Sequence, residues 1–205
     1  SVTPKDVALF IISKLSTSGA TGYFVEYSGN IFSEMSMEGR MTVCNLSIEM
    51  GARGGLISPD NKTIEYVKNR EYTPKGENLS KAIEYWSKLH TDEGAVFDKE
   101  YNFNSSEIEP MVTFGTNPGM GIRISGKIPE IDFEKDNSSS YLKSLKYMGY
   151  EIGDKMLGKK IDFVFLGSCT NGRIEDFRTF SKITKGFKKA SNITAWLVPG
   201  SHRVL

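Results

Sequence analysis

The chain has 205 residues, of which 39% are hydrophobic and 25% charged, an ordinary composition for a globular protein. Its 26 basic and 25 acidic side chains nearly cancel, which argues against a dedicated nucleic-acid or membrane-surface binder, since both usually carry a basic excess. No apolar run has the length of a membrane span, and the two cysteines, Cys44 and Cys169, are too few for a disulfide framework. We therefore expect a protein of a reducing, cytoplasmic environment.

Helical and extended patterns alternate through the first part of the chain. A helix is predicted to begin after Thr3, because Thr3 can cap it and Pro4 suits the first helical position. The elements predicted after it are a strand at 23–27, a helix from 36 to about 50, a short strand from 56, a short helix at 63–67, an amphipathic helix at 79–89 and extended segments at 99–104 and 111–114.

A stretch rich in glycine and proline, residues 115–129, favours a domain boundary, which we place between residues 118 and 119. The elements predicted beyond it are a surface loop at 132–140, a helix at 141–148, a strand at 161–165, a helix at 174–183 and a strand at 193–198. The last three are typical of a right-handed βαβ unit in a parallel sheet. The sequence thus predicts an α/β fold in two parts, 1–118 and 119–205. The second part looks incomplete, so we expect exposed apolar surface there and self-association.

Cys169 lies in the predicted turn between a strand and a helix, in the sequence LGSCTNGRIED at residues 166–176. We expect free backbone N–H groups at the start of that helix, which would stabilise a thiolate or a bound anion. The residue types leave four possibilities open: a small buried residue, a nucleophile, part of a phosphate cradle, or one thiolate ligand of an iron–sulfur cluster. A nucleophile needs a base, and neither histidine, His90 or His202, lies in a recognisable partner motif.

A second group of candidate residues follows Cys44, in the sequence CNLSIEMGA at residues 44–52. Asn45 and Glu49 are four residues apart, so on a helix they share one face. Spacing alone favours a solvated helix flank for these two side chains and a packing role for Cys44.

The segment from Gly167 to Asp176 resembles the cluster-binding segment of the aconitase superfamily. Within that superfamily, other parts of the chain resemble the large subunits of the isopropylmalate dehydratase family, and together they span nearly the whole sequence. These parts are SMEGRMTVCN at 36–45, EMGARGG at 49–55, TDEGA at 91–95 and VPGS at 198–201.

The resemblance implies aconitase-like α/β/α layers with mostly parallel sheets, in which 1–118 is the second domain and 119–205 the start of the third. It also implies a hydro-lyase of leucine biosynthesis that interconverts 2- and 3-isopropylmalate by dehydration and rehydration. In that family three cysteines hold a [4Fe–4S] cluster, and Cys169 matches the first of them. Glu49 matches a glutamate near the iron-bound water or hydroxyl, and Asn45 an active-site asparagine. The implied partners are a hydroxy-dicarboxylate substrate and a small subunit that completes a heterodimer.

The chain departs from the family pattern at several points. The other two cysteine ligands, expected as a downstream Cys-x-x-Cys, are absent, and so is the family's N-terminal domain. The serine base belongs to the small subunit. We therefore expect an internal piece of a longer chain that binds no complete cluster and has no activity by itself.

Other functions stay open at this point. Within the family these are a homoaconitase and a methylmalate or citraconate hydratase. Outside it they are a non-catalytic binding module with this fold and an enzyme that uses Cys169 as a nucleophile.

Overall fold

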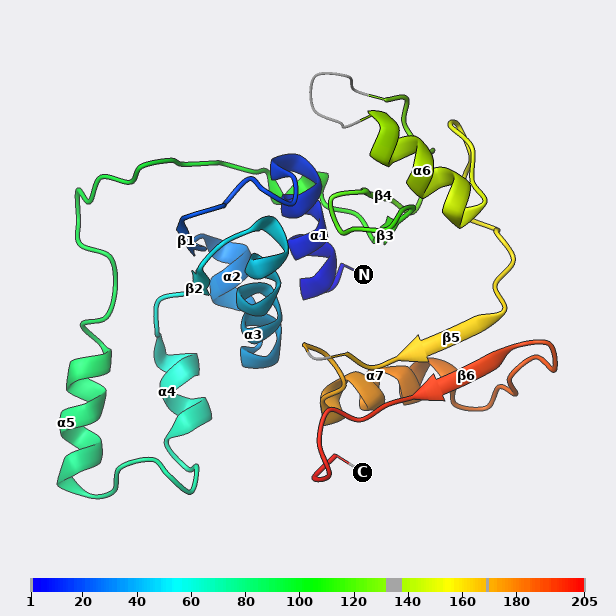
Figure 1. Ribbon diagram of the computed structural model, residues 1–205. Coiled ribbons are helices and arrows are strands. Elements are labelled where there is room, and N and C mark those ends of the chain that lie inside the picture. Colours follow the sequence, from blue (N-terminus) through cyan, green and yellow to red (C-terminus); the bar gives the residue numbers. More distant parts are fainter. Residues whose placement is uncertain (1, 132–137, 169, 205) are drawn as a thin grey trace. The chain divides into compact units, whose positions relative to one another are not determined.

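The structure is a computed structural model that describes residues 2–131, 138–168 and 170–204 (Figure 1). The chain divides into two compact units, residues 1–124 and 125–205. The predicted limits of the two aconitase-like domains, at residues 118 and 119, stay a prediction.

Unit 1 holds most of the helices, and its β-strands are short. Its elements are α1 (Pro4–Leu15), β1 (Phe24–Glu26), α2 (Asn30–Glu34), α3 (Met37–Leu46), the 3₁₀ helix η1 (Ser47–Met50), β2 (Gly54–Leu56), α4 (Asn61–Val67), α5 (Glu77–Trp86), the 3₁₀ helix η2 (Ser105–Glu107), β3 (Met111–Thr113) and β4 (Gly121–Arg123). Unit 2 holds α6 (Ser138–Met148), β5 (Phe163–Leu166), α7 (Ile174–Thr184) and β6 (Thr194–Leu197). No helix of the described residues combines the length and the apolar character needed to cross a membrane.

Helix α1 is the central element of unit 1. It contacts α3 on one side and the β3–β4 hairpin on another, and residues 6–12 are all buried. A helix that is apolar around its whole circumference can only be stable when it is enclosed in this way. The predicted cap is confirmed: the hydroxyl of Thr3 accepts the backbone N–H of Asp6 at 3.4 Å, and the carboxylate of Asp6 accepts the backbone N–H of Thr3 at 2.7 Å. The other oxygen of Asp6 accepts the N–H of Met111 at 2.7 Å, so the same carboxylate also fixes the start of β3.

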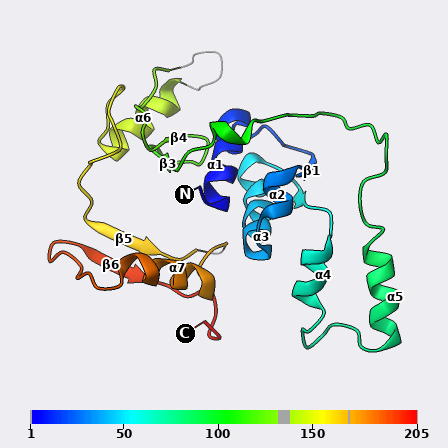
Figure 2. The same ribbon diagram turned by 180° about the vertical axis from the view of Figure 1, so that it is seen from behind.

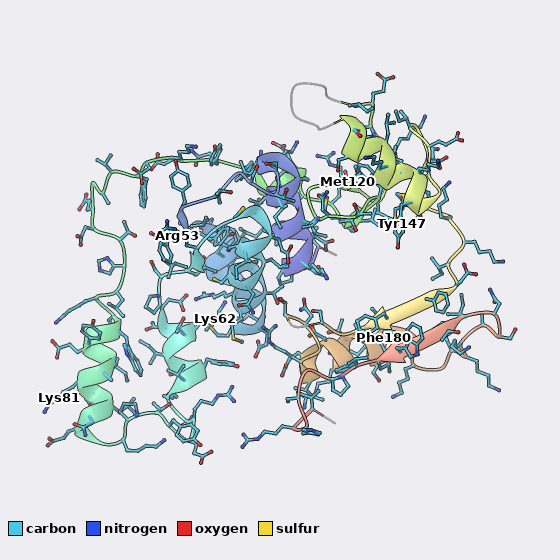
Figure 3. All side chains as sticks on the ribbon, viewed as in Figure 1. Arg53, Lys62, Lys81, Met120, Tyr147 and Phe180 are labelled. Carbon is cyan, nitrogen blue, oxygen red and sulfur yellow. The ribbon has the colours of Figure 1, made fainter. Side chains whose placement is uncertain are left out.

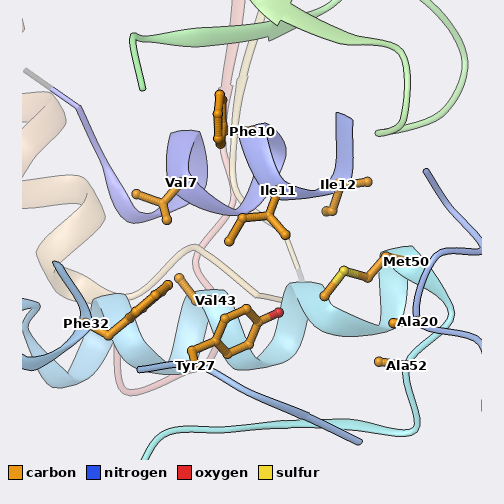
Figure 4. Packing of buried hydrophobic residues seen from close by; sticks show 10 residues of the cluster. All are labelled: Val7, Phe10, Ile11, Ile12, Ala20, Tyr27, Phe32, Val43, Met50 and Ala52. Carbon is orange, nitrogen blue, oxygen red and sulfur yellow. The ribbon is translucent and has the colours of Figure 1, made fainter. Parts of the chain in front are cut away.

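The hydrophobic core of unit 1 lies between α1, α3 and β1. Figure 4 shows Val7 and Ile11 pointing from α1 toward α3, while Phe10 points away from α3. The ring of Phe10 instead meets that of Phe103, edge to face, with 5.7 Å between their centroids. The buried cluster consists of Val7, Phe10, Ile11, Ile12, Ala20, Tyr27, Phe32, Val43, Met50 and Ala52.

Three two-stranded sheets form among the described residues. Strands β1 and β2 are parallel, β5 and β6 are parallel, and β3 and β4 are antiparallel. The parallel pairs agree with the predicted α/β class, in which helices connect neighbouring parallel strands. In unit 2, α7 forms the connection between β5 and β6, as the sequence predicts.

A partly buried ion pair joins three helices of unit 1. The side chain of Arg40, in α3, is only 4% exposed, and its guanidinium binds the carboxylate of Asp60, which caps α4, at 2.9 and 2.5 Å. Its remaining N–H groups donate to the carbonyls of Phe32 and Ser33 in α2 and to the hydroxyl of Thr63 in α4. The pKa of Asp60 is lowered to about 2, and the largest cause is its hydrogen bonding to Arg40.

Helices α4 and α5 extend away from the core of unit 1 in both views (Figures 1 and 2). Lys62 of α4, labelled in Figure 3, donates to three carbonyls at the end of α2: those of Ser33, Glu34 and Met35. A cation at this end complements the helix dipole. Helix α5 is amphipathic, as predicted, but it contains no buried residue.

Unit 2 has a small core and an uncovered apolar sheet face. Ile128, Tyr141 and Leu145 are buried, and the hydroxyl of Tyr141 donates to the carbonyl of Pro129 at 2.7 Å. On β5 and β6, by contrast, Phe163 and Trp196 are stacked with their ring centroids 5.5 Å apart, and both are more than half exposed. The expected exposed apolar surface is therefore confirmed, while self-association stays a prediction.

Some details differ from the predicted elements. The segment 99–104, predicted as extended, belongs to no helix and no sheet strand, and the ring of its Phe103 meets that of Phe10 in the core of unit 1. The stretch 115–129, predicted to contain a domain boundary, contains β4, which pairs with β3; in the connection between them a Cβ at Gly115 would collide with the Met120 side chain. The short helix α2 was not predicted. Of the loop predicted at 132–140, residues 132–137 lie outside the described residues, and 138–140 belong to α6.

The Arg40–Asp60 pair makes stability depend on pH. The pKa of Asp60 is lower in the folded protein than its ordinary value of 3.8, so its stabilisation is fully present above about pH 4 and is lost as the pH falls toward 2. A change from 3.8 to about 2 corresponds to ~2 kcal/mol, which solvent screening reduces to about 1 kcal/mol, because the Asp60 side chain is 39% exposed.

We expect Asp60→Asn to lower the free energy of unfolding by about 2 kcal/mol at pH 7, since Arg40 stays buried without its counter-ion. Urea unfolding between pH 2 and 7 checks this, and the difference from wild type should shrink toward pH 2. Glu65→Gln is the control, because Glu65 pairs with Lys68 on the surface and should contribute less than 1 kcal/mol. Equal losses for the two variants would contradict the assignment.

Candidate functional site

Asn45 and Glu49 both lie at the end of α3, but not in the same helix. Asn45 is in the last turn of α3, whereas Glu49 is in η1, so the predicted single helix from 36 to 50 is interrupted between them. Both side chains are exposed. Within the described residues neither side chain forms a hydrogen bond or an ion pair. The arrangement therefore leaves an amide and a carboxylate available to a ligand or to another part of a larger protein.

The turn between these two residues is fixed by buried contacts on its inner side. Ser47 is fully buried, and its hydroxyl lies 2.7 Å from that of Tyr27. Gly51 ends η1 with a positive φ of 81°, a conformation that suits glycine. Strand β2 passes so close that a Cβ on Gly55 would collide with the Ser47 hydroxyl and with the backbone of Cys44. The exposed candidate residues thus stand on a closely packed support.

Cys44 is half-buried in α3. Burial raises the pKa of its thiol, and the charge of Arg40 only partly opposes this effect. A thiol with a raised pKa stays protonated at neutral pH, whereas a metal ligand must be a thiolate. These features fit the packing role predicted for Cys44.

The turn from β5 to α7 has its own hydrogen bonds. Cys169 itself lies outside the described residues. The hydroxyl of Ser168 accepts the N–H groups of Thr170 and Asn171, which follow Cys169, at 3.2 and 2.8 Å. The carboxylate of Asp176 accepts the N–H groups of Gly172 and Arg173, at 2.7 and 2.9 Å.

The backbone N–H groups of residues 170–173, just before α7, are therefore not free. A serine turn and an aspartate cap already satisfy these four donors, and such local side-chain bonds compete with any external anion. These four groups are thus not available to a phosphate, whereas the expectation of free N–H groups at the start of α7 stays a prediction. The capping roles of Ser168 and Asp176 were not predicted, although serine and aspartate around a helix start are a known capping signal.

A cavity of about 590 Å³ in unit 1 is separate from these residues. It lies between α1, β1 and residues 97–108, and apolar side chains such as Phe10, Ile31 and Phe103 line it. Asn45 and Glu49 are not among its described lining residues. The candidate residues therefore belong to the outer surface of unit 1.

The cysteine content limits the metal chemistry of this chain. The aconitase-like resemblance implies three thiolate ligands for one cluster, but the sequence holds only Cys44 and Cys169. The part of the chain that the structure describes contains no group of three histidine, cysteine or acidic residues placed to hold a metal ion. The residues present do not fit a complete [4Fe–4S] site; at most Cys169 provides one ligand.

The chain combines an α/β fold with parallel strand pairs and the sequence GSCTN. Comparison with known proteins identifies the family that has these features. A sequence model of the aconitase family (aconitate hydratase) matches residues 1–205, so the chain belongs to the aconitase family. This match confirms the predicted fold class.

Several relatives of the chain carry one particular name, 3-isopropylmalate dehydratase large subunit. The chain is 63% identical to that protein of Flavobacterium johnsoniae over 203 residues, 58% to that of Bacteroides fragilis over 204, and 59% to that of Phocaeicola vulgatus over 203. Each comparison covers 99% of this chain but only 43–44% of the relative. The predicted resemblance is confirmed, and the chain spans less than half the length of these curated relatives.

The cap of α7 can be tested by substitution. We expect Asp176→Ala to destabilise the start of α7 by about 1 kcal/mol, because the N–H groups of Gly172 and Arg173 lose their acceptor. Amide hydrogen exchange should then become faster at these two residues. Glu175→Ala is the matched control, since Glu175 makes only a 3.8 Å surface contact with Arg178. Unchanged exchange in Asp176→Ala would show that another group satisfies these amides.

Proposed function

We propose that the chain is part of a [4Fe–4S] hydro-lyase that interconverts 2-isopropylmalate and 3-isopropylmalate by dehydration and rehydration, a reaction of leucine biosynthesis. The observation that carries the proposal is the 63% identity, over 99% of the chain, to a 3-isopropylmalate dehydratase large subunit. The names of the relatives favour isopropylmalate over the homoaconitase and methylmalate alternatives. We further propose that the protein works in a reducing, cytoplasmic environment, as its cysteine content predicts.

Glu49 is assigned to the proton chemistry of the reaction. Dehydration removes a hydroxyl and a proton from neighbouring carbons, so the leaving oxygen must be oriented and must gain a proton. The Glu49 carboxylate is exposed and has no partner among the described residues, so it is available to hold that proton at a carboxylate oxygen. Asn45, equally exposed, carries an amide that can donate to a substrate carboxylate and accept from a hydroxyl.

Cys169 is assigned as one of three thiolate ligands of the cluster, with the other two outside residues 1–205. When bound, a cluster of this kind supplies a Lewis-acidic iron. Because the chain has only one matching ligand, we expect residues 1–205 alone to hold no complete cluster and to be inactive. The partner is a small subunit, which the name of the relatives implies and which provides the missing base.

The role of Glu49 can be tested in the full-length protein assembled with its small subunit and cluster. We expect Glu49→Gln to lower kcat for isopropylmalate dehydration by about 10²-fold or more, since proton transfer by a placed side chain contributes about that much. Glu77→Gln is the control, because Glu77 is an exposed carboxylate of the same unit, on α5. A Glu49→Gln enzyme with kcat within twofold of wild type would exclude the proposed role.

The assignment of Cys169 predicts a spectroscopic result. We expect anaerobically reconstituted Cys169→Ser to lose the visible absorption of the cluster and most of its bound iron, whereas Cys44→Ser should keep both. Iron analysis and absorption of the full-length protein measure this without relying on activity. A normal cluster in Cys169→Ser would overturn the assignment, and lack of a cluster in the wild type would favour the binding-module alternative.

A further inference from the structure

The hydroxyls of Tyr27 and Ser47 form a buried pair beneath the segment that carries Asn45 and Glu49. The Ser47 hydroxyl donates to the carbonyl of Val43 at 3.2 Å and lies 2.7 Å from the Tyr27 hydroxyl. A hydroxyl has one proton to donate, and Ser47 uses its proton for Val43. The arrangement that satisfies both contacts runs from Tyr27, as donor to Ser47, through Ser47 to the carbonyl of Val43. Figure 4 shows the Tyr27 hydroxyl directed toward α3.

This chain of bonds stands where α3 changes into η1. The backbone N–H of Ser47 points to the carbonyls of Cys44 and Asn45, not to that of Val43, four residues earlier. In a regular α-helix the Val43 carbonyl would accept that N–H. Here it accepts the Ser47 side chain instead, which satisfies the carbonyl and lets the backbone tighten into a 3₁₀ turn. The Ser47 hydroxyl thus takes the place of one backbone donor at the break.

Further contacts hold the same turn to its surroundings. The N–H of Ala52 donates to the carbonyl of Ser47 at 3.2 Å, and that of Ala20 donates to the carbonyl of Met50 at 2.9 Å. Ser47 and Met50 are buried, whereas Glu49 between them is exposed. The direction of the Glu49 side chain therefore follows from the geometry of the turn.

We propose that Tyr27 and Ser47 are positioning residues for the isopropylmalate reaction: by fixing the break between α3 and η1, they set the distance and direction between the Asn45 amide and the Glu49 carboxylate. The inference rests on the proposed function. Neither residue touches substrate; both act through the backbone of residues 45–49. Burial, the largest cause, raises the pKa of Tyr27 to about 12. The Tyr27 hydroxyl therefore keeps the proton that it donates to Ser47 throughout the working pH range.

The test is a double-mutant cycle on the full-length enzyme with its small subunit and cluster. Tyr27→Phe and Ser47→Ala each remove one hydroxyl, and each is made in the wild-type and the Glu49→Gln background. We expect each to lower kcat by about tenfold in the wild type, because a small misplacement of a catalytic group has effects of this order. In the Glu49→Gln background the same substitutions should change kcat by less than twofold.

Phe10→Leu is the control for a general loss of stability, because Phe10 lies in the same core but points away from α3 (Figure 4). It should lower the melting temperature and leave kcat within twofold of wild type. If Tyr27→Phe and Ser47→Ala keep the wild-type kcat, or lower it equally in both backgrounds, the positioning role is wrong, while the role of Glu49 is unaffected. A Glu49→Gln enzyme with wild-type kcat would instead remove the proposed function on which the inference rests.

Discussion

The buried guanidinium of Arg40 is the constraint on which the helical part of unit 1 depends. All five of its N–H donors have acceptors, on α2 and on the first turn of α4, so one side chain of α3 sets the orientation of two other helices. A buried charge with an unmet donor costs several kcal/mol, which makes this geometry hard to vary. Arg40 lies near the start of α3 and the Tyr27–Ser47 pair at its end. The helix that presents Asn45 is therefore held at both ends by polar contacts inside an apolar core.

Hydrogen-bond partners distinguish the structural acids of this chain from the candidate catalytic one. Asp6, Asp60 and Asp176 each accept backbone N–H groups at the start of a helix, where a carboxylate also complements the helix dipole. Glu49 also lies in the first turn of a helix, η1, but its carboxylate accepts no bond among the described residues. An acid whose carboxylate is already engaged has less capacity for substrate, so partners inside the fold are a better guide than exposure alone.

Local rules predicted the elements that depend on neighbouring residues, and failed where distant residues decide. The cap at Thr3 and the strand–helix–strand order of residues 163–197 follow from short sequence patterns, and the structure contains them. The contact of Ser47, at the helix break, with Tyr27 was missed because the two residues are twenty positions apart and no local pattern predicts it. The partner of Arg40 was missed for the same reason. The roles of Asn45, Glu49 and Cys169 came from family resemblance, since spacing alone favoured a solvated flank for the first two.

The distribution of candidate residues explains why activity is expected only from a longer protein. Asn45 and Glu49 belong to unit 1, whereas Cys169 belongs to unit 2, and one of the three expected cluster ligands is present. Under the proposed function, the carboxylate and the cluster act on the same substrate, so their separation must be fixed to a fraction of an ångström. The Tyr27–Ser47 pair can fix the geometry only within unit 1. Under the proposed function, the remaining precision must come from residues outside unit 1, including those that supply the other two thiolates.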